Sequence, residues 1–151
     1  MAGDRAMWTA LVAVEQERAR LRAEFWRHAE RRAATLARAI DDGGWDRSVA
    51  LEFLAGFPDD VPELLDRLIP LSISHGWAGA VRAALTVPYR MGDLPGLDRD
   101  VLARLDAADD DEFRRLAELL DHLRAWTALA ELVERAAGSP DPNIRAVADD
   151  F

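Results

Sequence analysis

Two of the three histidines follow a glutamate by four residues, a spacing that places both side chains on one face of a helix. The pairs are Glu24 with His28 and Glu118 with His122. Two such helices lying side by side would offer two carboxylates and two imidazoles to a divalent ion. Di-iron carboxylate bundles instead use Glu-x-x-His, with the histidine three residues on. We therefore interpret both pairs as ordinary surface pairs, and we predict no metal site and no cofactor.

Hydroxyl and imidazole side chains, the components of nucleophilic catalysis, also occur together in Ser72, Ser74 and His75. The Gly-x-Ser-x-Gly motif is absent, and no acid that would orient the imidazole is identifiable. The chain contains no cysteine, and all 19 of its basic residues are arginine. Thiolate nucleophiles, Schiff bases and a phosphate-loop lysine are therefore excluded. We predict no catalytic residue, and a metal-dependent helical-bundle enzyme remains only the second alternative to a binding protein.

The elements that would position these residues are predicted to be helices. Residues 6–40 contain neither glycine nor proline, and apolar side chains recur every three to four residues. This predicts one long helix within residues 1–40, packed along one side of the others and ended by the Asp-Asp-Gly-Gly sequence at 41–44. Arg18, His28 and Arg32 interrupt the apolar stripe, which makes the segment a poor coiled coil.

Residues 41–151 are predicted to form shorter helices separated by turns. Proline and glycine mark a loop at 88–97 and a break at 138–142. Asp109 and Glu112 have the spacing of a capping box that begins a helix. Nothing breaks the pattern from there to Ala137, so residues 109–137 are one helix or two. No segment alternates like a strand, and the predicted fold class is all-α.

The C-terminal residues 124–151 resemble one HEAT-type helical repeat. The resemblance is carried by an apolar first helix, an Asp-Pro turn, and a second helix that opens with an aliphatic residue and arginine. The matching residues are Arg124, Ala125, Leu129, Leu132, Asp141, Pro142, Ile144, Arg145 and Ala148. Weaker echoes begin near residue 44, where Gly44-Trp45 and Gly76-Trp77 each precede a predicted helix.

This resemblance implies a single domain, 1–151, in which residues 41–151 form a short α-solenoid-like stack of antiparallel helix hairpins beside the long N-terminal helix 1–40. It also implies that the chain turns between Asp121 and Arg124. The alternative is a closed helical bundle in which 109–137 is one helix. Stacked hairpins usually bind other proteins without a reactive centre, so the expected function is that of a protein-protein interaction module.

The charge of the chain, −9 in total, is uneven along its length. Residues 1–40 hold eight arginines against five acids, whereas residues 41–151 hold eleven arginines against 23 acids. The negative charge of residues 41–151 repels phosphate, which argues against nucleic-acid binding and favours a basic protein partner. An immunity or inhibitor protein that covers a cationic toxin or nuclease is the narrower alternative. Asp109, Asp110 and Asp111 are the predicted contact residues, because three adjacent acids exceed what one helix cap requires.

The hydropathy of the chain bears on its location. The N-terminus has no apolar secretory stretch, and the longest uncharged run, 68–81, has 14 residues where a membrane helix needs about 20. We therefore expect a cytoplasmic protein without a membrane partner. The five tryptophans are expected to lie mostly in the core. The sequence leaves open the identity of the partner, the binding face and the oligomeric state.

Overall fold

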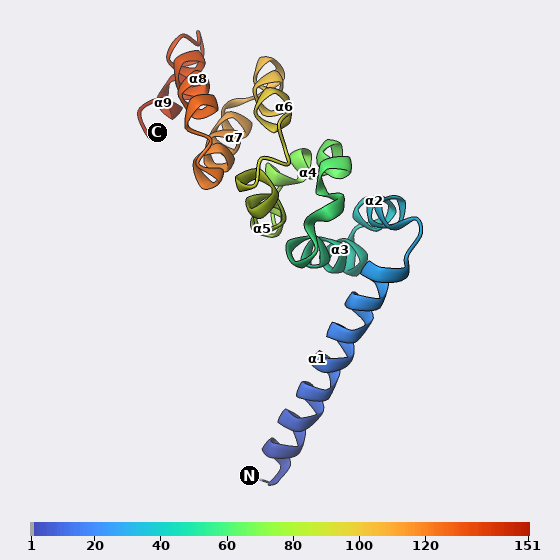
Figure 1. Cartoon of the computed structure of the whole chain (residues 1–151). Helices are drawn as coiled ribbons and strands as arrows, with labels where there is room; N and C mark the ends of the chain where they lie inside the picture. The colour runs from blue at the N-terminus through green and yellow to red at the C-terminus, as the bar shows by residue number, and fades with distance from the viewer. Residues whose placement is uncertain (1) are drawn as a thin grey trace.

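The computed structural model describes the backbone of residues 2–151 and the side chains of residues 3–151. Within this range all regular structure is helical and no strand is present, which confirms the all-α prediction (Figure 1). The α-helices are α1 (Ala2–His28), α2 (Arg32–Asp42), α3 (Gly44–Gly56), α4 (Leu65–Ser72), α5 (Ala78–Arg90), α6 (Leu97–Ala103), α7 (Asp110–Leu123), α8 (Trp126–Ala137) and α9 (Pro142–Val147). Two 3-10 helices are η1 (Pro58–Leu64) and η2 (Leu105–Ala107). None of the described helices is both long and apolar enough to cross a membrane.

The prediction of one long helix over residues 1–40, packed along the others, is wrong in two respects. The helix breaks between His28 and Arg32, and α1 projects away from the rest of the molecule instead of lying on it (Figure 1). Every residue from Gly3 to Leu21 is exposed. By contrast, α2 buries Leu36 and Ile40 against the helices that follow it.

Contacts made by the end of α1 and the start of α2 explain the break. Arg32 donates to the carbonyl oxygen of Trp26, and its guanidinium pairs with Asp60 in η1. Both partners of this ion pair are mostly buried, with side chains 21% and 11% exposed. Trp26 in turn donates from Nε1 to Asp59. These bonds hold the chain in a corner that no glycine or proline marks in the sequence.

The remaining helices, α2 to α9, form the body of the molecule, in which each helix packs mainly on helices one or two places away in the chain (Figure 1). In this body, α2 packs on α3, α3 on α5, α5 on α4 and α7, and α7 on both α8 and α9. Fully buried leucines run through its core, among them Leu51, Leu85 and Leu120. The predicted stop after α2 is confirmed, since α2 ends at Asp42 and both following glycines, Gly43 and Gly44, have positive φ.

Residues 109–137 are two helices, and the turn lies at Arg124 and Ala125, at the end of the interval 121–124 in which the repeat pattern predicts one. Arg124 has the left-handed φ of 58°, and the amide of Ala125 donates to the carbonyl of Leu120. Together with the bond from Arg124 N–H to Asp121, this is a Schellman motif with arginine in the position that glycine usually takes. The alternative bundle with one continuous helix over 109–137 is therefore wrong in that element.

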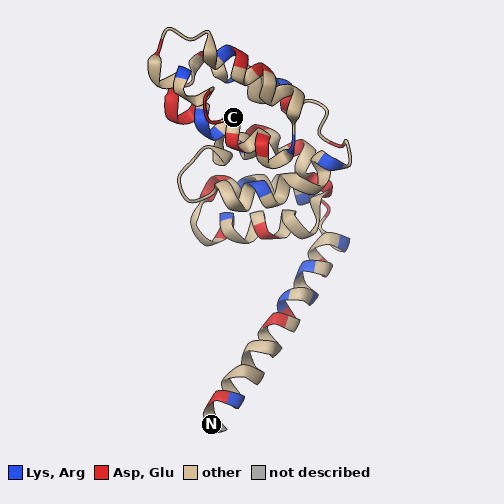
Figure 2. Cartoon of the chain, turned by 90° about the vertical axis from the view of Figure 1, so that its left-hand side faces the viewer, with Lys and Arg blue, Asp and Glu red and all other residues tan. Residues whose placement is uncertain are grey.

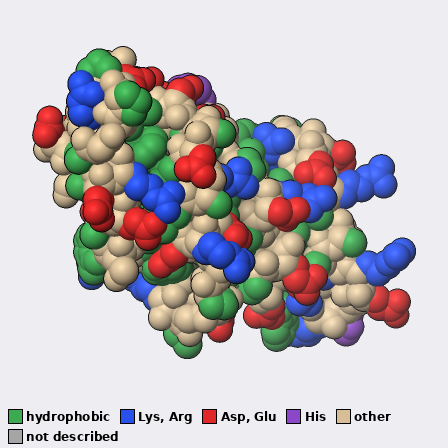
Figure 3. Space-filling view, turned by 90° about the horizontal axis from the view of Figure 1, so that it is seen from above, with side chains coloured by type: hydrophobic (Ala, Val, Ile, Leu, Met, Phe, Trp, Pro, Cys, Tyr) green, Lys and Arg blue, Asp and Glu red, His purple; other side chains and the backbone are tan. Residues whose placement is uncertain are grey.

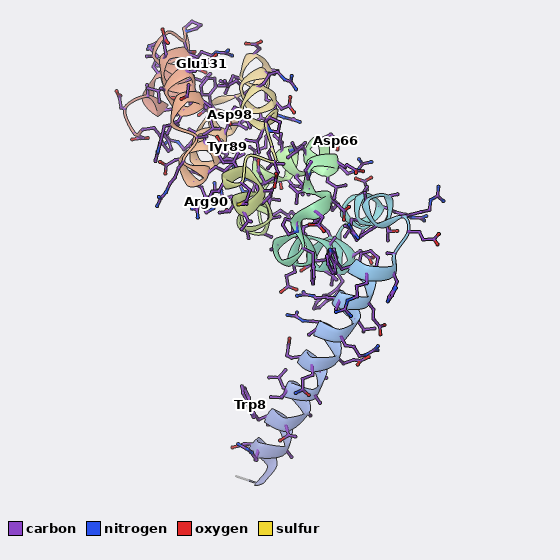
Figure 4. All side chains as sticks on the ribbon, viewed as in Figure 1. Trp8, Asp66, Tyr89, Arg90, Asp98 and Glu131 are labelled. Atoms are coloured by element: carbon purple, nitrogen blue, oxygen red, sulfur yellow. The ribbon has the colours of Figure 1, made fainter. Side chains whose placement is uncertain are left out.

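The predicted turns hold in part. The capping box at Asp109 is present, because its side chain accepts from the Glu112 amide and Glu112 accepts from the Asp109 amide. The break at 138–142 is also present, and Asp141 caps α9. The expected loop 88–97 begins later than predicted, because α5 continues through Pro88 to Arg90. Tyr89 then reaches across the loop and donates to Asp98 of α6 (Figure 4).

Candidate protein-binding surfaces

Acidic residues from two distant stretches meet at the end of the body formed by α7 and α9. Arg114 on α7 forms an ion pair with Asp150, which follows α9. Asp109 to Glu112, at the start of α7, lie one turn away from Arg114 on the same helix. We call this surface the acidic end and define it by the residues Asp109, Asp110, Asp111, Glu112, Asp149 and Asp150.

The charges at the acidic end are only partly balanced. Arg114 and Arg115, on the next turn of α7, pair with acids of this surface, and Arg115 forms an ion pair with Asp111 at 3.0 Å. The hydrogen bond to Asp150 raises the pKa of Arg114, with a smaller contribution from the charge of Asp110. Six carboxylates against two guanidinium groups leave a formal charge of about −4. All of these acids except Glu112 are exposed, including the predicted contact residues Asp109, Asp110 and Asp111.

Asp59 and Asp60, a further pair of adjacent acids in the sequence, lie elsewhere. Asp60 is 8% exposed and bound to Arg32, and Asp59 accepts from Trp26. Both belong to the corner between α1 and α2 and do not join the acidic end. Figure 3, which views the body from above, shows acidic and basic side chains interspersed over that face.

The two glutamate-histidine pairs are not brought together by the fold. Glu24 and His28 lie at the end of α1 that joins α2 and α3, whereas Glu118 and His122 lie on α7 near α8 and α9 (Figure 1). Glu24 pairs with Arg20, Glu118 pairs with Arg82, and His122 lies 3.1 Å from the hydroxyl of Thr86. Among the described residues, no group of three or more histidine or acidic side chains could hold a metal ion together.

Ser72, Ser74 and His75 do not form a catalytic arrangement. Both hydroxyls donate to carbonyl oxygens of their own helical turn, Ser72 to Ile69 and Ser74 to Leu71. His75 is exposed and lies about 3 Å from the guanidinium of Arg115, which also donates to the Ile73 carbonyl. The group beside the imidazole is thus a cation and not the acid that catalysis would need. The contacts of Arg115 instead hold the end of α4 against α7.

An apolar groove that the sequence analysis did not predict lies at the other end of the body from the acidic end. It has a volume of about 450 Å³ and is formed where the last turns of α1 meet α2 and α3. We call it the basal groove. Its apolar lining comprises Leu21 and Phe25 from α1, Leu36 and Ala39 from α2, and Trp45, Val49 and Phe53 from α3. Arg18 and Arg22 also line it, and both pair with Glu52.

The part of α1 beyond the basal groove carries an exposed apolar strip. Residues 6–14 are uncharged, and Figure 2 shows them as an uninterrupted tan stretch near the N-terminal end. We define the distal strip as four apolar residues of this stretch whose side chains are 50–68% exposed: Met7, Trp8, Leu11 and Val14. Figure 4 shows Trp8 projecting from α1 far from any other element.

No relative identifies the chain. Comparisons with protein-family models, with curated proteins and with solved structures found no match. The acidic end, the basal groove and the distal strip therefore have to be judged on their own chemistry.

The tryptophans show why the groove and the strip escaped sequence reasoning. The expectation that they lie mostly in the core is wrong: Trp8, Trp26, Trp45 and Trp126 are 39–86% exposed. Trp77 is half-buried, with the guanidinium of Arg47 over its ring. The available signal was the uncharged stretch 6–14 inside an otherwise charged helix, because a helix that met only water would carry polar residues all round.

Proposed function

We propose that the chain is a non-catalytic protein-binding module whose acidic end receives a basic protein. The observation that supports this proposal is the convergence of acids from residues 109–112 and 149–150 around Arg114. Two segments about 40 residues apart contribute to one surface with a net negative charge. A field of this kind speeds the capture of a positively charged partner and repels the phosphates of nucleic acids.

The helical architecture fits this role. Helices α8 and α9, which lie in the segment 124–151 that resembles a HEAT-type repeat, pack on each other and on α7. In such hairpins, exposed helix ends and faces serve as binding surfaces, while the core only holds the helices in place. We extend the proposal to this HEAT-like role, which rests on analogy of sequence pattern.

An inhibitor that covers a cationic toxin or nuclease is the narrower version of the same proposal. It uses the same acidic end and differs only in the identity of the basic partner. It predicts that the captured protein is an enzyme whose active surface is basic, and that its activity falls when the complex forms.

The test replaces Asp109, Asp110 and Asp111 together by asparagine. The side-chain amide introduced by Asp109→Asn keeps an oxygen that can cap α7, so the fold is retained while three charges are removed. The matched control replaces three exposed acids outside the acidic end, Glu30→Gln, Glu63→Gln and Asp93→Asn. Both variants change the net charge by the same amount.

The measurement is affinity capture from the native host, followed by titration of the captured protein. We expect a basic protein whose affinity falls about 10-fold or more in the Asp109–Asp111 variant and little in the control variant. Raising the salt from about 50 to 500 mM shortens the Debye length from roughly 14 to 4 Å and should weaken the complex further. Equal binding by all three proteins, insensitive to salt, would contradict the proposal, and so would binding of DNA or RNA at physiological salt.

A further inference from the structure

The distal strip and the basal groove lie on the same face of α1. Met7, Leu11, Val14, Arg18, Leu21 and Phe25 follow one another at alternating steps of four and three residues. This spacing keeps successive side chains above one another on a helix. The first three belong to the distal strip, and Arg18, Leu21 and Phe25 line the basal groove. One helix therefore carries an apolar ridge at its free end and one wall of an apolar groove at its base.

In a single molecule, neither feature has a partner within the described residues. The distal strip meets no other element, and Trp45 and Val49 on the far wall of the groove are 86% and 51% exposed. Exposed apolar side chains of this size add to a patch of a few hundred Å², on the order of the largest that monomeric proteins carry. An isolated helix in water also gains little stability from its own backbone bonds. Both considerations favour a second helix beside α1.

We propose that two copies of this chain pair through α1 in an antiparallel, two-fold symmetric dimer, in which the distal strip of each copy fills the basal groove of the other. The proposal is independent of the acidic end, which lies at the opposite end of the molecule. The symmetry is self-consistent because each copy supplies one ridge and one groove.

The register of the dimer follows from the spacing. Placing residue 16 of both helices at the two-fold axis puts Leu11 of one copy beside Leu21 of the other. Met7 then lies beside Phe25 of the second copy, and Trp8 lies near its Arg22. Leu11 in the strip lies about 21 Å along the helix axis from Phe25 in the groove, which is roughly half the length of α1. Two antiparallel copies of α1 that overlap along their length therefore place the strip of each beside the groove of the other.

The charges also favour the antiparallel arrangement. The centre of α1 carries Glu15, Glu17, Arg18 and Arg20. In the antiparallel pair, the arginines of each copy lie within about one turn of the glutamates of the other. A parallel pair would instead place Arg18 beside Arg18 and leave both basal grooves empty. Arg18, one of the three residues that interrupt the apolar stripe, lies two residues from the centre of the antiparallel pair.

The buried area is sufficient for a stable dimer. Each copy contributes its strip and its groove, so two strips and two grooves are covered at once. The total is roughly 1,000–1,600 Å², which lies in the range of specific interfaces between proteins. The core of this interface is apolar and includes Trp8 and Trp45, the residue type most often found at energetic centres of interfaces.

The first experiment measures the mass of the intact chain by sedimentation and light scattering over a concentration series. We expect a dimer that dissociates on dilution. Leu11→Glu, in the distal strip, should raise the dissociation constant at least about 30-fold. Ala13→Glu, which lies on α1 away from the apolar face, adds the same charge and should leave the constant nearly unchanged. Both positions are exposed, so neither variant disturbs the body. A chain that is monomeric at every concentration, or a dimer unaffected by Leu11→Glu, would overturn the proposal.

The second experiment tests the direction of the helices by disulfide formation, which is free of background because the chain has no cysteine. Leu11→Cys and Leu21→Cys proteins are oxidised separately and as a mixture. The antiparallel register predicts that only the mixture forms a cross-linked dimer in high yield, because a disulfide needs Cα atoms within about 7 Å. Efficient cross-linking of Leu11→Cys with itself would show parallel helices and overturn the proposal.

Discussion

Helices α1 and α7 make an informative pair, because both begin near acids, carry apolar residues at helical spacing and lack glycine and proline after the first turn. In α7 six apolar side chains are buried, since α5, α8 and α9 cover one face of the helix. In α1 every residue from 3 to 21 is exposed. The same kind of pattern thus accompanies a buried face in α7 and complete exposure over residues 3–21 of α1.

The difference shows what a periodic apolar face determines and what it does not. Periodicity requires that a face be covered, but it does not say whether the cover belongs to the same chain. In α7 the cover comes from α5, which precedes it in the chain, and from α8 and α9, which follow it. Over residues 3–21 of α1 no segment of the described chain supplies it.

The largest expected effect separates the two helices directly. Leu120→Ala in α7 removes a fully buried side chain, so the free energy of unfolding should fall by about 2–5 kcal/mol. Leu11→Ala in α1 should change it by less than about 0.5 kcal/mol in a monomer. Urea denaturation at protein concentrations low enough to dissociate any dimer measures both values. A Leu11→Ala loss above about 1 kcal/mol under these conditions would mean that the distal strip packs on its own body.

The next effect concerns the corner at which α1 leaves the body. Arg32→Ala leaves Asp60 without its partner and removes the bond to Trp26, so the free energy of unfolding should fall by about 2 kcal/mol. This value lies below the range for fully buried pairs because one-fifth of the arginine side chain is exposed. Adding Asp60→Asn removes the stranded charge, and the double variant should lose less than the sum of the two single losses. Additive losses would show that the pair does not hold the corner.

A smaller effect compares this corner with the other break that lacks glycine and proline, between α7 and α8. Arg124 has a left-handed φ, which side chains disfavour, so Arg124→Gly should raise the free energy of unfolding by about 0.5–1 kcal/mol. Ala130→Gly, at an exposed position inside α8, should lower it by about 1 kcal/mol. Destabilisation by both variants would indicate that α7 and α8 form one helix in solution.

The smallest effect is spectroscopic and reports on the packing of the body alone. Tyr89 is the only tyrosine, and burial, together with its bond to Asp98, raises its pKa to about 12. The fold favours the neutral phenol, so this contribution to stability is complete below about pH 10 and is lost as the pH rises through 12. Absorbance at 295 nm follows the ionisation, and Asp98→Asn should move it to lower pH. Ionisation near pH 10 in the native protein would contradict the burial of Tyr89 and its hydrogen bond to Asp98.

The elements whose limits depend on local chemistry could be predicted from the sequence. Three such features lie where the pattern indicated: the capping box at Asp109, the glycines after Asp42 and the Asp-Pro turn before α9. Each begins or ends a helix through residues that are adjacent or nearly adjacent in the sequence. The acids of the acidic end were also identifiable in part, because Asp109, Asp110 and Asp111 are adjacent. Their proximity to Asp149 and Asp150 depends on how α9 packs on α7, which residue spacing does not show.

The features that could not be predicted depend on long-range contacts. The corner after His28 is held by an ion pair between residues 28 positions apart, with no glycine or proline to mark it. Asp60 is buried beside Arg32, although its neighbours in the sequence give no sign of this pairing. The basal groove likewise needs three helices to be in place before it exists.

The helices of the body pack mainly on helices that are near them in the sequence, which has a consequence for how the protein folds. The packed pairs of helices join segments that are close in sequence, with α5 to α7 and α4 to α7 among the most distant. Few long loops must close before a contact forms, and domains with such local topology reach the native state within microseconds to milliseconds. The turns and packing of α2 with α3 need nothing from α8 or α9. The N-terminal part of the body can therefore begin to organise on the ribosome before the residues that form the acidic end have been synthesised.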